Sequence, residues 1–227
     1  MIWIAPVHIG LIVPSSNTVM EPDFHRHFQR AAIVSTTRIL LQQVTREAEL
    51  QMLEELPRAA GLIKTAAPDA VVFGCTSAGS LEGLAHDARI RQMIEQETGA
   101  KTFTVLQAVL LQLSTISPKN IAVCTPYRED LTGSVARCIA EGGYAIVKAV
   151  GMGLRENLDI GRVTPPEIVR FVESNLGGTT ADCLFLSCTN WRAVEAINLL
   201  RSKLGIPVIS SNQAAIAAVQ QATAAGI

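Results

Sequence analysis

The chain lacks a strong excess of charge of either sign. It has 227 residues, with 19 Lys and Arg against 20 Asp and Glu, so its formal net charge is −1. No basic stripe is therefore expected to hold a nucleic-acid backbone or an anionic membrane surface. Long apolar runs are missing too, since stretches such as 9–13 and 71–73 fall well below the roughly 20 residues that span a bilayer. The expected partner is a small molecule, with no nucleic acid and no membrane.

The sequence also lacks the usual marks of secretion, metal binding and nucleotide binding. Residues 1–14 have neither a basic leader nor a long apolar core, which predicts a cytoplasmic protein. The five cysteines are odd in number and widely spaced, and the four histidines show no metal spacing. There is no G-x-G-x-x-G and no phosphate loop ending in Gly-Lys-Ser/Thr. The sequence therefore predicts chemistry without a metal, nucleotide or other cofactor.

Short β-rich runs alternate with helical patterns along the chain. The pattern predicts strands at 8–16 (ending in a turn), 70–74 and, more weakly, 101–105, with helices at 45–66 and 85–97. Strands that alternate with helices favour an α/β fold with parallel sheets flanked by helices. Hydrophobic residues make up 48% of the chain, which is enough for one sizeable body or two small ones.

An internal repeat divides the chain into two similar parts. Three ordered pairs carry it: "IGLIVP" (9–14) with "IAVCTP" (121–126), "DAVVFGCTS" (69–77) with "DCLFLSCTN" (182–190), and "GAKTFTVLQA" (99–108) with "GIPVISSNQA" (205–214). Such ordered self-similarity indicates two homologous α/β halves. We expect the first half to comprise 1–112 and the second 113–212, with the last helix, 213–227, packing back on the first half.

Two cysteines occupy matching positions in this repeat. Cys75 follows one predicted strand and Cys188 follows its counterpart, and ligands of open parallel sheets collect at the carboxyl ends of the strands. A helix is expected after each, and a helix amino-terminus lowers a thiol's pKa and favours the nucleophilic thiolate. Burial for packing is the alternative, because cysteine often behaves as a small hydrophobe. That alternative is preferred for Cys124, Cys138 and Cys183.

Polar residues in three further loops are candidates for binding a carboxylate. The opening turn supplies Ser15 and Asn17, whose hydroxyl, amide and backbone N–H groups suit an anion, although an ordinary helix cap fits equally well. Tyr127 follows the matching strand in the second half and either donates its hydroxyl into the cleft or is a half-buried aromatic. Asn157 lies in a polar loop, where a turn residue is the simpler interpretation.

At these residues the chain resembles the aspartate/glutamate racemase superfamily, and within it the branch of maleate cis-trans isomerases and arylmalonate decarboxylases. The motifs that carry the resemblance are "GLIVPSSNTVMEPDF" (10–24), "FGCTSAGS" (73–80), "TPY" (125–127) and "LSCTNWRAVEAI" (186–197). The resemblance implies two four-stranded parallel α/β domains related by a pseudo-twofold axis. It also implies an active site in the cleft between the domains.

The resemblance further implies a reaction. Decarboxylases of this branch typically have glycine at the first cysteine position, whereas this chain has both Cys75 and Cys188, which favours an isomerase or racemase. Amino-acid racemases usually carry an acidic residue in the opening turn, where this chain has Asn17. The pattern looks more like a maleate isomerase. In the implied mechanism, the Cys75 thiolate adds to one alkene carbon, Cys188 supplies a proton to the other, the single bond rotates and fumarate is released.

The family also implies how the substrate is held. Asn17, Tyr127 and Asn157 match its carboxylate-binding positions. Backbone N–H groups near four further residues are expected to stabilise the charge that develops on addition: Ser15, Thr76, Ser77 and Thr189.

Other functions remain open at this stage. A cofactor-independent racemase would use the two thiols as acid and base on opposite faces of one carbon. The second cysteine motif is also similar to the ectoine-utilisation branch, where Trp191 and Arg192 would shape a different pocket, although Arg192 as a solvated helix residue is the simpler interpretation. A small-acid binding protein without turnover is the non-enzymatic alternative. The family resemblance predicts a homo-oligomer.

Overall fold

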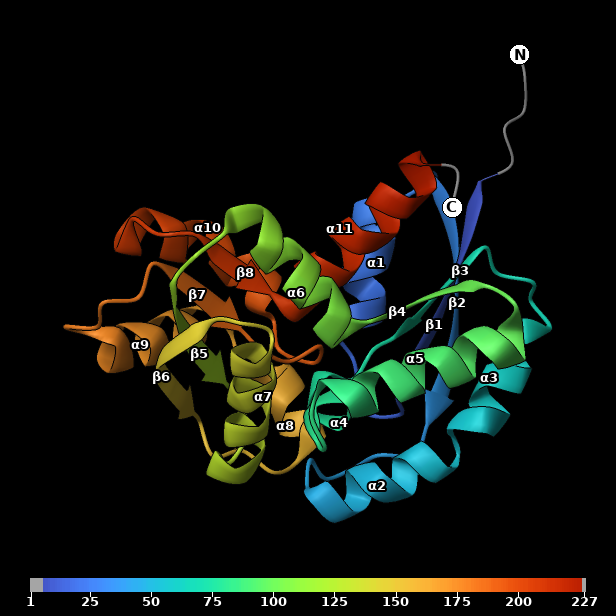
Figure 1. The fold of residues 1–227 in the computed structure, drawn as a ribbon, viewed down its shortest axis with the longest axis horizontal. Coiled ribbons are helices and arrows are strands. Elements are labelled where there is room, and N and C mark those ends of the chain that lie inside the picture. Colours follow the sequence, from blue (N-terminus) through green and yellow to red (C-terminus); the bar gives the residue numbers. More distant parts are fainter. Residues whose placement is uncertain (1–5, 226–227) are drawn as a thin grey trace.

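Two four-stranded parallel sheets form the framework of the computed structural model, which describes residues 6–225 (Figure 1). The first has the order β2-β1-β3-β4 and the second the order β6-β5-β7-β8. The strands are β1 (Val7–Pro14), β2 (Ala32–Ile39), β3 (Ala70–Phe73), β4 (Lys101–Thr104), β5 (Asn120–Thr125), β6 (Ala145–Gly151), β7 (Cys183–Leu186) and β8 (Val208–Ser210). The expected pair of α/β halves is confirmed, and the matching orders make β3 and β7 equivalent strands.

Helices follow the strands and cover both sheets. They are α1 (Met20–Phe28), α2 (Arg46–Glu54), α3 (Leu56–Lys64), α4 (Thr76–Ser80), α5 (Leu84–Thr98), α6 (Val105–Ile116), α7 (Glu129–Glu141), α8 (Asn157–Arg162), α9 (Pro165–Leu176), α10 (Ala193–Leu204) and α11 (Ser211–Ala224). The repeat extends to helix caps: the Thr104 side chain accepts from the Gln107 N–H before α6, and Ser210 accepts from the Gln213 N–H before α11. A side-chain acceptor here satisfies one of the unpaired donors of the first turn.

The predicted single helix over 45–66 is wrong. The structure has two helices here, with Glu55 between α2 and α3. Pro57 lies in the first turn of α3, and proline lacks the N–H that a continuous helix needs while its ring clashes with the preceding turn. The break turns α2 away from α3, so that α2 contacts α4.

Helices α6 and α11 pack against each other and connect the two halves (Figure 1). Each follows the last strand of its own sheet, and α11 contacts α1 and β4 of the first half as well as β8 and α10 of the second. The predicted boundary between residues 112 and 113 falls inside α6. The division into 1–112 and 113–212 therefore stays a prediction about folding units.

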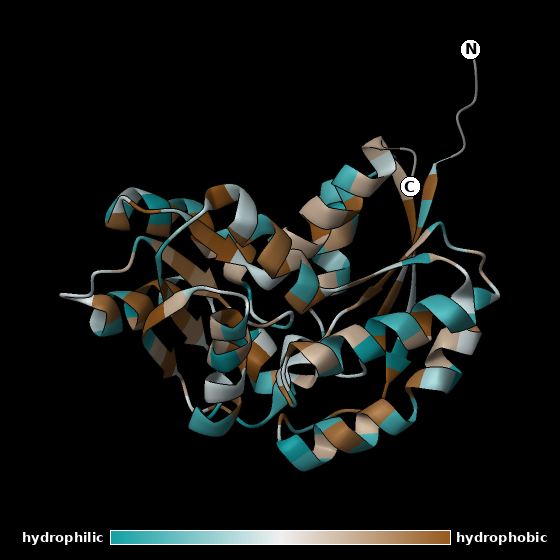
Figure 2. Cartoon of the chain, in the orientation of Figure 1, coloured by the Kyte–Doolittle hydropathy of each residue, from teal (hydrophilic) through white to brown (hydrophobic). Residues whose placement is uncertain are grey.

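The apolar core is continuous across both halves. One cluster of buried side chains includes residues of β1, β3, β5, β7 and β8, and a second cluster lies between the first sheet and helices α2, α3 and α5. Figure 2 shows the central strands in the hydrophobic colour, while the helices alternate between hydrophobic and hydrophilic residues. Burial of this core against both faces fits the near-continuous apolar runs of β3 and β7.

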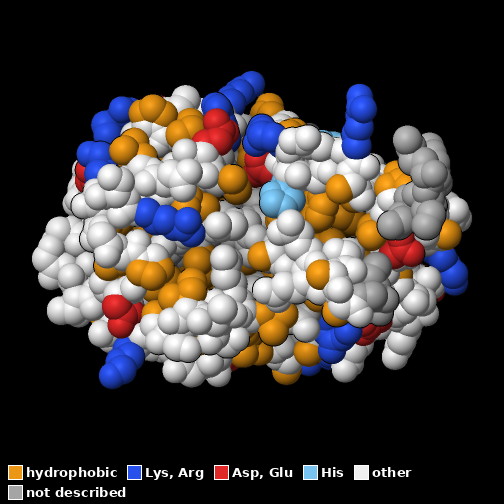
Figure 3. Space-filling model, turned by 90° about the horizontal axis from the view of Figure 1, so that it is seen from above, with side chains coloured by type: hydrophobic (Ala, Val, Ile, Leu, Met, Phe, Trp, Pro, Cys, Tyr) orange, Lys and Arg blue, Asp and Glu red, His pale blue; other side chains and the backbone are white. Residues whose placement is uncertain are grey.

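The surface carries charges of both signs. The face in Figure 3 shows Lys and Arg side chains scattered among Asp and Glu, with uncharged atoms between them. Over residues 6–225, no helix combines the length and the apolar character that crossing a bilayer requires.

Candidate active site

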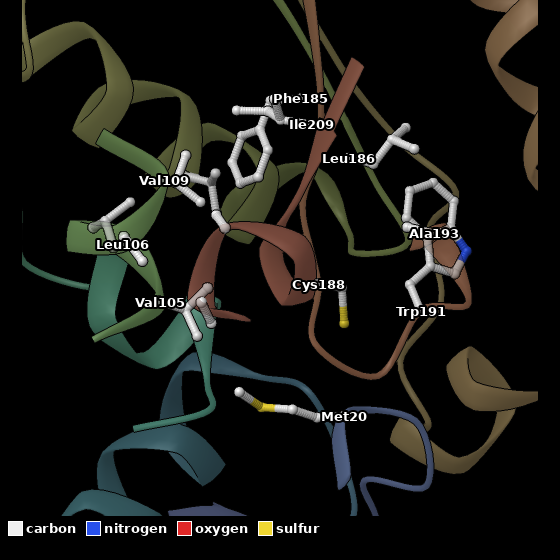
Figure 4. Close-up of a cluster of buried hydrophobic side chains, with 14 of the residues drawn as sticks. Met20, Val105, Leu106, Val109, Phe185, Leu186, Cys188, Trp191, Ala193 and Ile209 are labelled. Atoms are coloured by element: carbon white, nitrogen blue, oxygen red, sulfur yellow. The ribbon is translucent and has the colours of Figure 1, made fainter. Parts of the chain in front are cut away.

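Cys75 and Cys188 lie just beyond the carboxyl ends of the equivalent strands β3 and β7. Cys75 is the N-cap of α4, as expected, whereas Cys188 is followed by a turn and α10 begins only at Ala193. The helix expected after Cys188 is therefore present, but Cys188 is not at its amino-terminus. In Figure 4 the Cys188 sulfur points out of this loop toward the side of Met20, which belongs to α1 of the first half. Cys188 thus faces the boundary between the halves.

Both thiols are enclosed at this boundary. Cys75 is 5% exposed and Cys188 is 4% exposed. Hydrogen bonds join the residues that flank the two cysteines: Thr189 Oγ1 donates to the Gly74 carbonyl over 2.9 Å, and the Thr76 and Ser211 hydroxyls lie 2.9 Å apart. Two thiols in one enclosed site can act on the same small molecule.

Burial, not the helix terminus, dominates the acidity of the two thiols. It raises the pKa of Cys188 to about 12 and raises the pKa of Cys75 as well. The lowered pKa expected from a helix amino-terminus is wrong. Loss of hydrating water destabilises the thiolate more than the hydrogen bonds from nearby donors stabilise it. Those donors are present: Ser77 and the Ala78 N–H lower the Cys75 pKa. Both residues are thus thiols at neutral pH, and a thiol is the form that donates a proton.

Hydrogen-bond donors converge on the Cys188 sulfur. The Asn190 N–H donates to it over 3.3 Å, and the Tyr127 hydroxyl lowers its pKa by hydrogen bonding. Tyr127 is 2% exposed and burial raises its own pKa, so it remains a neutral donor. The structure places Tyr127 beside both cysteines, as predicted for a residue of the cleft.

Asn17 joins the two halves next to the cysteines. Its side-chain Nδ2 donates to Thr189 Oγ1 over 3.0 Å, and Thr189 in turn donates to the Gly74 carbonyl over 2.9 Å. The Asn17 Oδ1 accepts from the Val19 and Met20 N–H groups. Asn17 therefore accepts from N–H groups at the start of α1, close to the cap interpretation, and it also lies at the boundary between the halves, while carboxylate binding by this turn stays a prediction.

Asn157 enters the same network from the second half. It is 3% exposed and is the first residue of α8. Its Nδ2 donates to Ser16 Oγ over 2.9 Å, and Asn190 donates to its backbone carbonyl over 2.6 Å. The simpler turn interpretation therefore does not describe Asn157, whose side chain links the halves.

The remaining predicted residues differ in how free they are to bind an anion. The Ser15 N–H already donates to the Ile39 carbonyl over 2.6 Å, so the donor expected there is committed to the fold. Thr76 and Ser77 are the first two residues of α4, where N–H groups lack partners within the helix. The Thr76 hydroxyl shares a 2.9 Å hydrogen bond with Ser211 of the second half.

Four site residues were missed by the sequence interpretation. They are Glu49, Asn190, Ser211 and Asn212, all of them at most 1% exposed. A signal existed for two of them, because "SSN" at 210–212 repeats the "SSN" of the opening turn. No sequence signal pointed to Glu49, because it lies in a segment whose pattern is typical of an amphipathic helix exposed to solvent.

The side chains of Trp191 and Arg192 have partners in the core and on the surface, although the Trp191 backbone N–H donates to Cys188. Trp191 is fully buried in the apolar core, edge-on to Phe171 with ring centroids 6.4 Å apart. The Arg192 guanidinium pairs with Glu195 through two 2.9 Å contacts on the surface. The packing role preferred for the other three cysteines fits their places in the core, in β5, α7 and β7.

Replacing Asn190 by alanine is expected to destabilise the join between the halves. Its Oδ1 accepts from the Thr18 N–H over 2.8 Å, and its Nδ2 donates to the Asn157 carbonyl. Both groups would lose their partner. The buried Asn157 carbonyl would be left unsatisfied, which costs about 1–3 kcal/mol, whereas Thr18 is exposed and its N–H can bond to water. Urea unfolding followed by circular dichroism measures the change. Asn175→Ala, on the partly buried helix α9, is the control, and an equal loss in both variants would contradict this role.

Glu49 makes the stability of the fold depend on pH. Burial raises the pKa of its carboxyl from 4.5 to about 8, so between these values the folded chain holds a proton that the unfolded chain has lost. The stabilisation is complete below about pH 4.5 and is lost as the pH rises to about 8. Glu49→Gln is expected to flatten this decline in urea unfolding free energies measured between pH 5 and pH 8.5. A parallel decline in wild type and variant would contradict it.

Over the described residues 6–225, no three His, Cys, Asp or Glu side chains come together in a way that would hold a metal ion. The groups gathered around the two cysteines are amides, hydroxyls and backbone N–H groups, together with one buried carboxyl. They suit the recognition of a small polar acid.

Two like α/β halves that enclose equivalent cysteines define the class of this protein, the duplicated fold of the aspartate/glutamate racemase superfamily. Residues 9–226 match the profile of the family described as arylmalonate decarboxylase, and the chain belongs to that family. The resemblance found in the sequence motifs is thus confirmed.

Known relatives cover nearly the whole chain. Maleate isomerase of Geobacillus stearothermophilus is 29% identical over 217 residues, which is 89% of this chain and 86% of the relative. Arylmalonate decarboxylase of Bordetella bronchiseptica is 25% identical over 207 residues, 91% of this chain and 86% of the relative. The structure of Nocardia farcinica maleate cis-trans isomerase bound to Tris matches with a TM-score of 0.90 at 21% identity, covering 95% of this chain and 91% of that one. The last likeness shows the shared fold.

Proposed function

We propose that this protein is a cofactor-independent cis-trans isomerase that converts maleate to fumarate. The observation that carries the proposal is the pair of enclosed thiols, Cys75 and Cys188, at equivalent strand ends in one site. A carbon–carbon double bond does not rotate freely, so an enzyme must convert it temporarily into a single bond. Addition of a thiol across the double bond does so, and a second thiol supplies the proton that addition requires.

In the proposed reaction, the Cys75 thiol loses its proton to a base as its Sγ forms a bond to one alkene carbon, while Cys188 gives its proton to the other carbon. The intermediate is a succinyl thioether, and rotation about its central bond interchanges the cis and trans arrangements. Elimination then returns one proton to Cys188, breaks the C–S bond, restores the proton of the Cys75 thiol and releases fumarate. Donors to both sulfurs favour the thiolate forms that appear during the cycle.

The two carboxylates require polar groups on both sides of the thiols. We assign this role to Asn17, Tyr127 and Asn157, which are buried in the network that joins the halves. Backbone N–H groups of Thr76, Ser77 and Thr189 are proposed to stabilise the charge that develops on the carboxylate next to the attacked carbon. Ser15 is proposed to act only by holding the opening turn, through Leu41.

The relatives support the proposed reaction. Four curated relatives at 25–29% identity are maleate isomerases. A cysteine-to-serine mutant of the Nocardia farcinica maleate cis-trans isomerase has been solved with a covalently bound succinylcysteine intermediate, on a chain that matches with a TM-score of 0.89. The intermediate of that enzyme is the one that the two-thiol chemistry proposed above requires.

Incubation with maleate in deuterated buffer, followed by proton NMR, tests the proposal. Fumarate is expected to form, and Cys188→Ser is expected to accumulate a succinyl adduct that mass spectrometry locates on Cys75. Racemisation, the second use of two facing thiols, would instead introduce deuterium next to a carboxylate of a chiral acid without forming fumarate. Thermal stabilisation by acids without any turnover would indicate a binding protein and would refute an enzymatic role.

A cytoplasmic location and a homo-oligomer complete the proposal. All five cysteines are free thiols, which suits a reducing compartment. The oligomer rests on the family resemblance, and light scattering coupled to size exclusion measures it directly.

A further inference from the structure

A buried carboxyl lies next to Cys75 and has no part in the mechanism above. Glu49, on α2, is completely inaccessible to solvent. Its Oε1 accepts a hydrogen bond from the Ser77 hydroxyl, and its Oε2 is buried without a hydrogen-bond partner among the described residues. A buried carboxyl with one unsatisfied oxygen is costly, so its presence beside the site calls for a function.

The Ser77 hydroxyl connects Glu49 to the cysteine. Ser77 Oγ lies 3.7 Å from Cys75 Sγ. A serine hydroxyl has a single proton to donate. Once Glu49 is ionised, which burial delays to about pH 8, Ser77 gives this proton to Glu49, and the Cys75 thiol is then the donor to Ser77. The hydrogen bonds therefore run in one direction, from Cys75 Sγ through Ser77 Oγ to Glu49 Oε1.

We propose that Glu49 accepts the proton of Cys75 through Ser77 when the thiol adds to the substrate. This role deepens the proposed isomerase function and rests on it for the identity of the substrate. As the C–S bond forms, the S–H proton moves to Ser77 Oγ, the former Ser77 proton moves to Glu49 Oε1, and the carboxylate becomes a carboxylic acid. Cys188 protonates the other carbon and becomes a thiolate. Elimination reverses each transfer, so that protons and electrons balance. Glu49 is a positioning residue that acts through Ser77 and does not touch the substrate.

The surroundings make Glu49 a strong base for a carboxylate. Burial raises the pKa of Glu49, the hydrogen bond from Ser77 opposes this rise and the charge of Asp130 on α7 adds to it, so that the pKa is about 8. In turn, negative charge on Glu49 raises the pKa of Cys75, Cys188 and Tyr127. Hydrogen bonds from Ser77 and the Ala78 N–H lower the pKa of Cys75, so they favour the negative charge that the sulfur develops while its proton leaves. A base with a pKa near the working pH is the most effective proton acceptor.

Two roles for Glu49 predict opposite results. If Glu49 acts only as a nearby negative charge, Glu49→Gln lowers the pKa of Cys75 and makes the thiol more reactive. If Glu49 accepts the proton, the same change makes the thiol less reactive, because glutamine cannot act as a base. The sign of the change in Cys75 reactivity distinguishes the two.

The rate at which iodoacetamide alkylates Cys75, followed by peptide mass spectrometry between pH 6 and 9, is the test. The wild-type rate is expected to rise as Glu49 ionises near pH 8. Glu49→Gln and Ser77→Ala are each expected to slow alkylation about tenfold or more at pH 8, as for loss of a general base. The double variant should be no slower than either single variant, and Glu47→Gln, on the exposed face of the same helix, should match wild type. Glu49→Asp keeps the charge but shortens the side chain, so slow alkylation in this variant supports transfer rather than charge.

Equal or faster alkylation in Glu49→Gln would overturn the proposal, and normal alkylation in Ser77→Ala would overturn the route through Ser77. Alkylation requires no maleate, so the outcome is separate from that of the isomerase assay. Slow alkylation in Glu49→Gln, without any maleate turnover in wild type, would support the proton relay from Cys75 to Glu49 and reject maleate as the substrate. Maleate turnover in wild type together with unaltered alkylation in Glu49→Gln would support maleate as the substrate and reject the proton relay.

Discussion

Cys75→Ser and Cys188→Ser are each expected to lower the conversion of maleate to fumarate by more than about 10⁴-fold, the scale seen when one member of a cooperating catalytic set is removed. Serine keeps the size of the side chain but is a far weaker acid and a weaker nucleophile than a thiol. Without Cys75 no C–S bond forms, so the double bond cannot rotate. Without Cys188 the second carbon lacks its proton donor. Proton NMR of the maleate and fumarate alkene signals measures both rates.

Cys138→Ser is the control for this experiment. Cys138 is also buried, and its sulfur donates to the Ser80 carbonyl over 3.6 Å, a contact that a serine hydroxyl can replace. Its turnover should stay within a few fold of wild type. Full activity in Cys75→Ser or in Cys188→Ser would exclude the two-thiol mechanism. A loss of the same size in Cys138→Ser would show that serine damages the fold instead.

Trp191→Ala is expected to lower the free energy of unfolding by about 3–5 kcal/mol, the usual cost of removing a large buried aromatic side chain. Trp191 is among the largest fully buried side chains, and Figure 4 shows it beside Ala193 on the far side of Cys188 from the helix bearing Val105 and Leu106. Its removal leaves a cavity in the core of the second half and ends the edge-on contact with Phe171. Urea unfolding followed by circular dichroism gives the difference.

Trp191→Phe separates packing from hydrogen bonding at the same position. The indole Nε1 is buried without a partner among the described residues, so phenylalanine removes a polar atom that contributes no hydrogen bond. This variant should lose much less stability than the alanine variant. Similar losses in the two variants would mean that the indole nitrogen, and not the volume of the ring, stabilises this part of the core.

Much of the architecture follows from local patterns. The runs at 70–74 and 182–190 are short, apolar and followed by small polar residues, a pattern that depends on a few neighbouring residues. The edge strands β2 and β6 were not identified. Most of β2 and β6 is partly exposed, so these edge strands lack the apolar run or strict alternation that identifies a strand. Pro57 was a visible local signal, and it should have divided the helix predicted over 45–66.

The sequence by itself determined the repeat, the equivalence of Cys75 and Cys188, and the polar character of the opening turn, since each depends on residues close together in the chain. Only the tertiary structure decided the acidity of the thiols, because a pKa depends on how much water the surrounding elements exclude. It alone also brought Glu49 against Ser77, 28 residues away, and Thr18 against Asn190, 172 residues away. Contacts at such separations depend on how helices and sheets pack, and neither helical periodicity nor strand patterning encodes them.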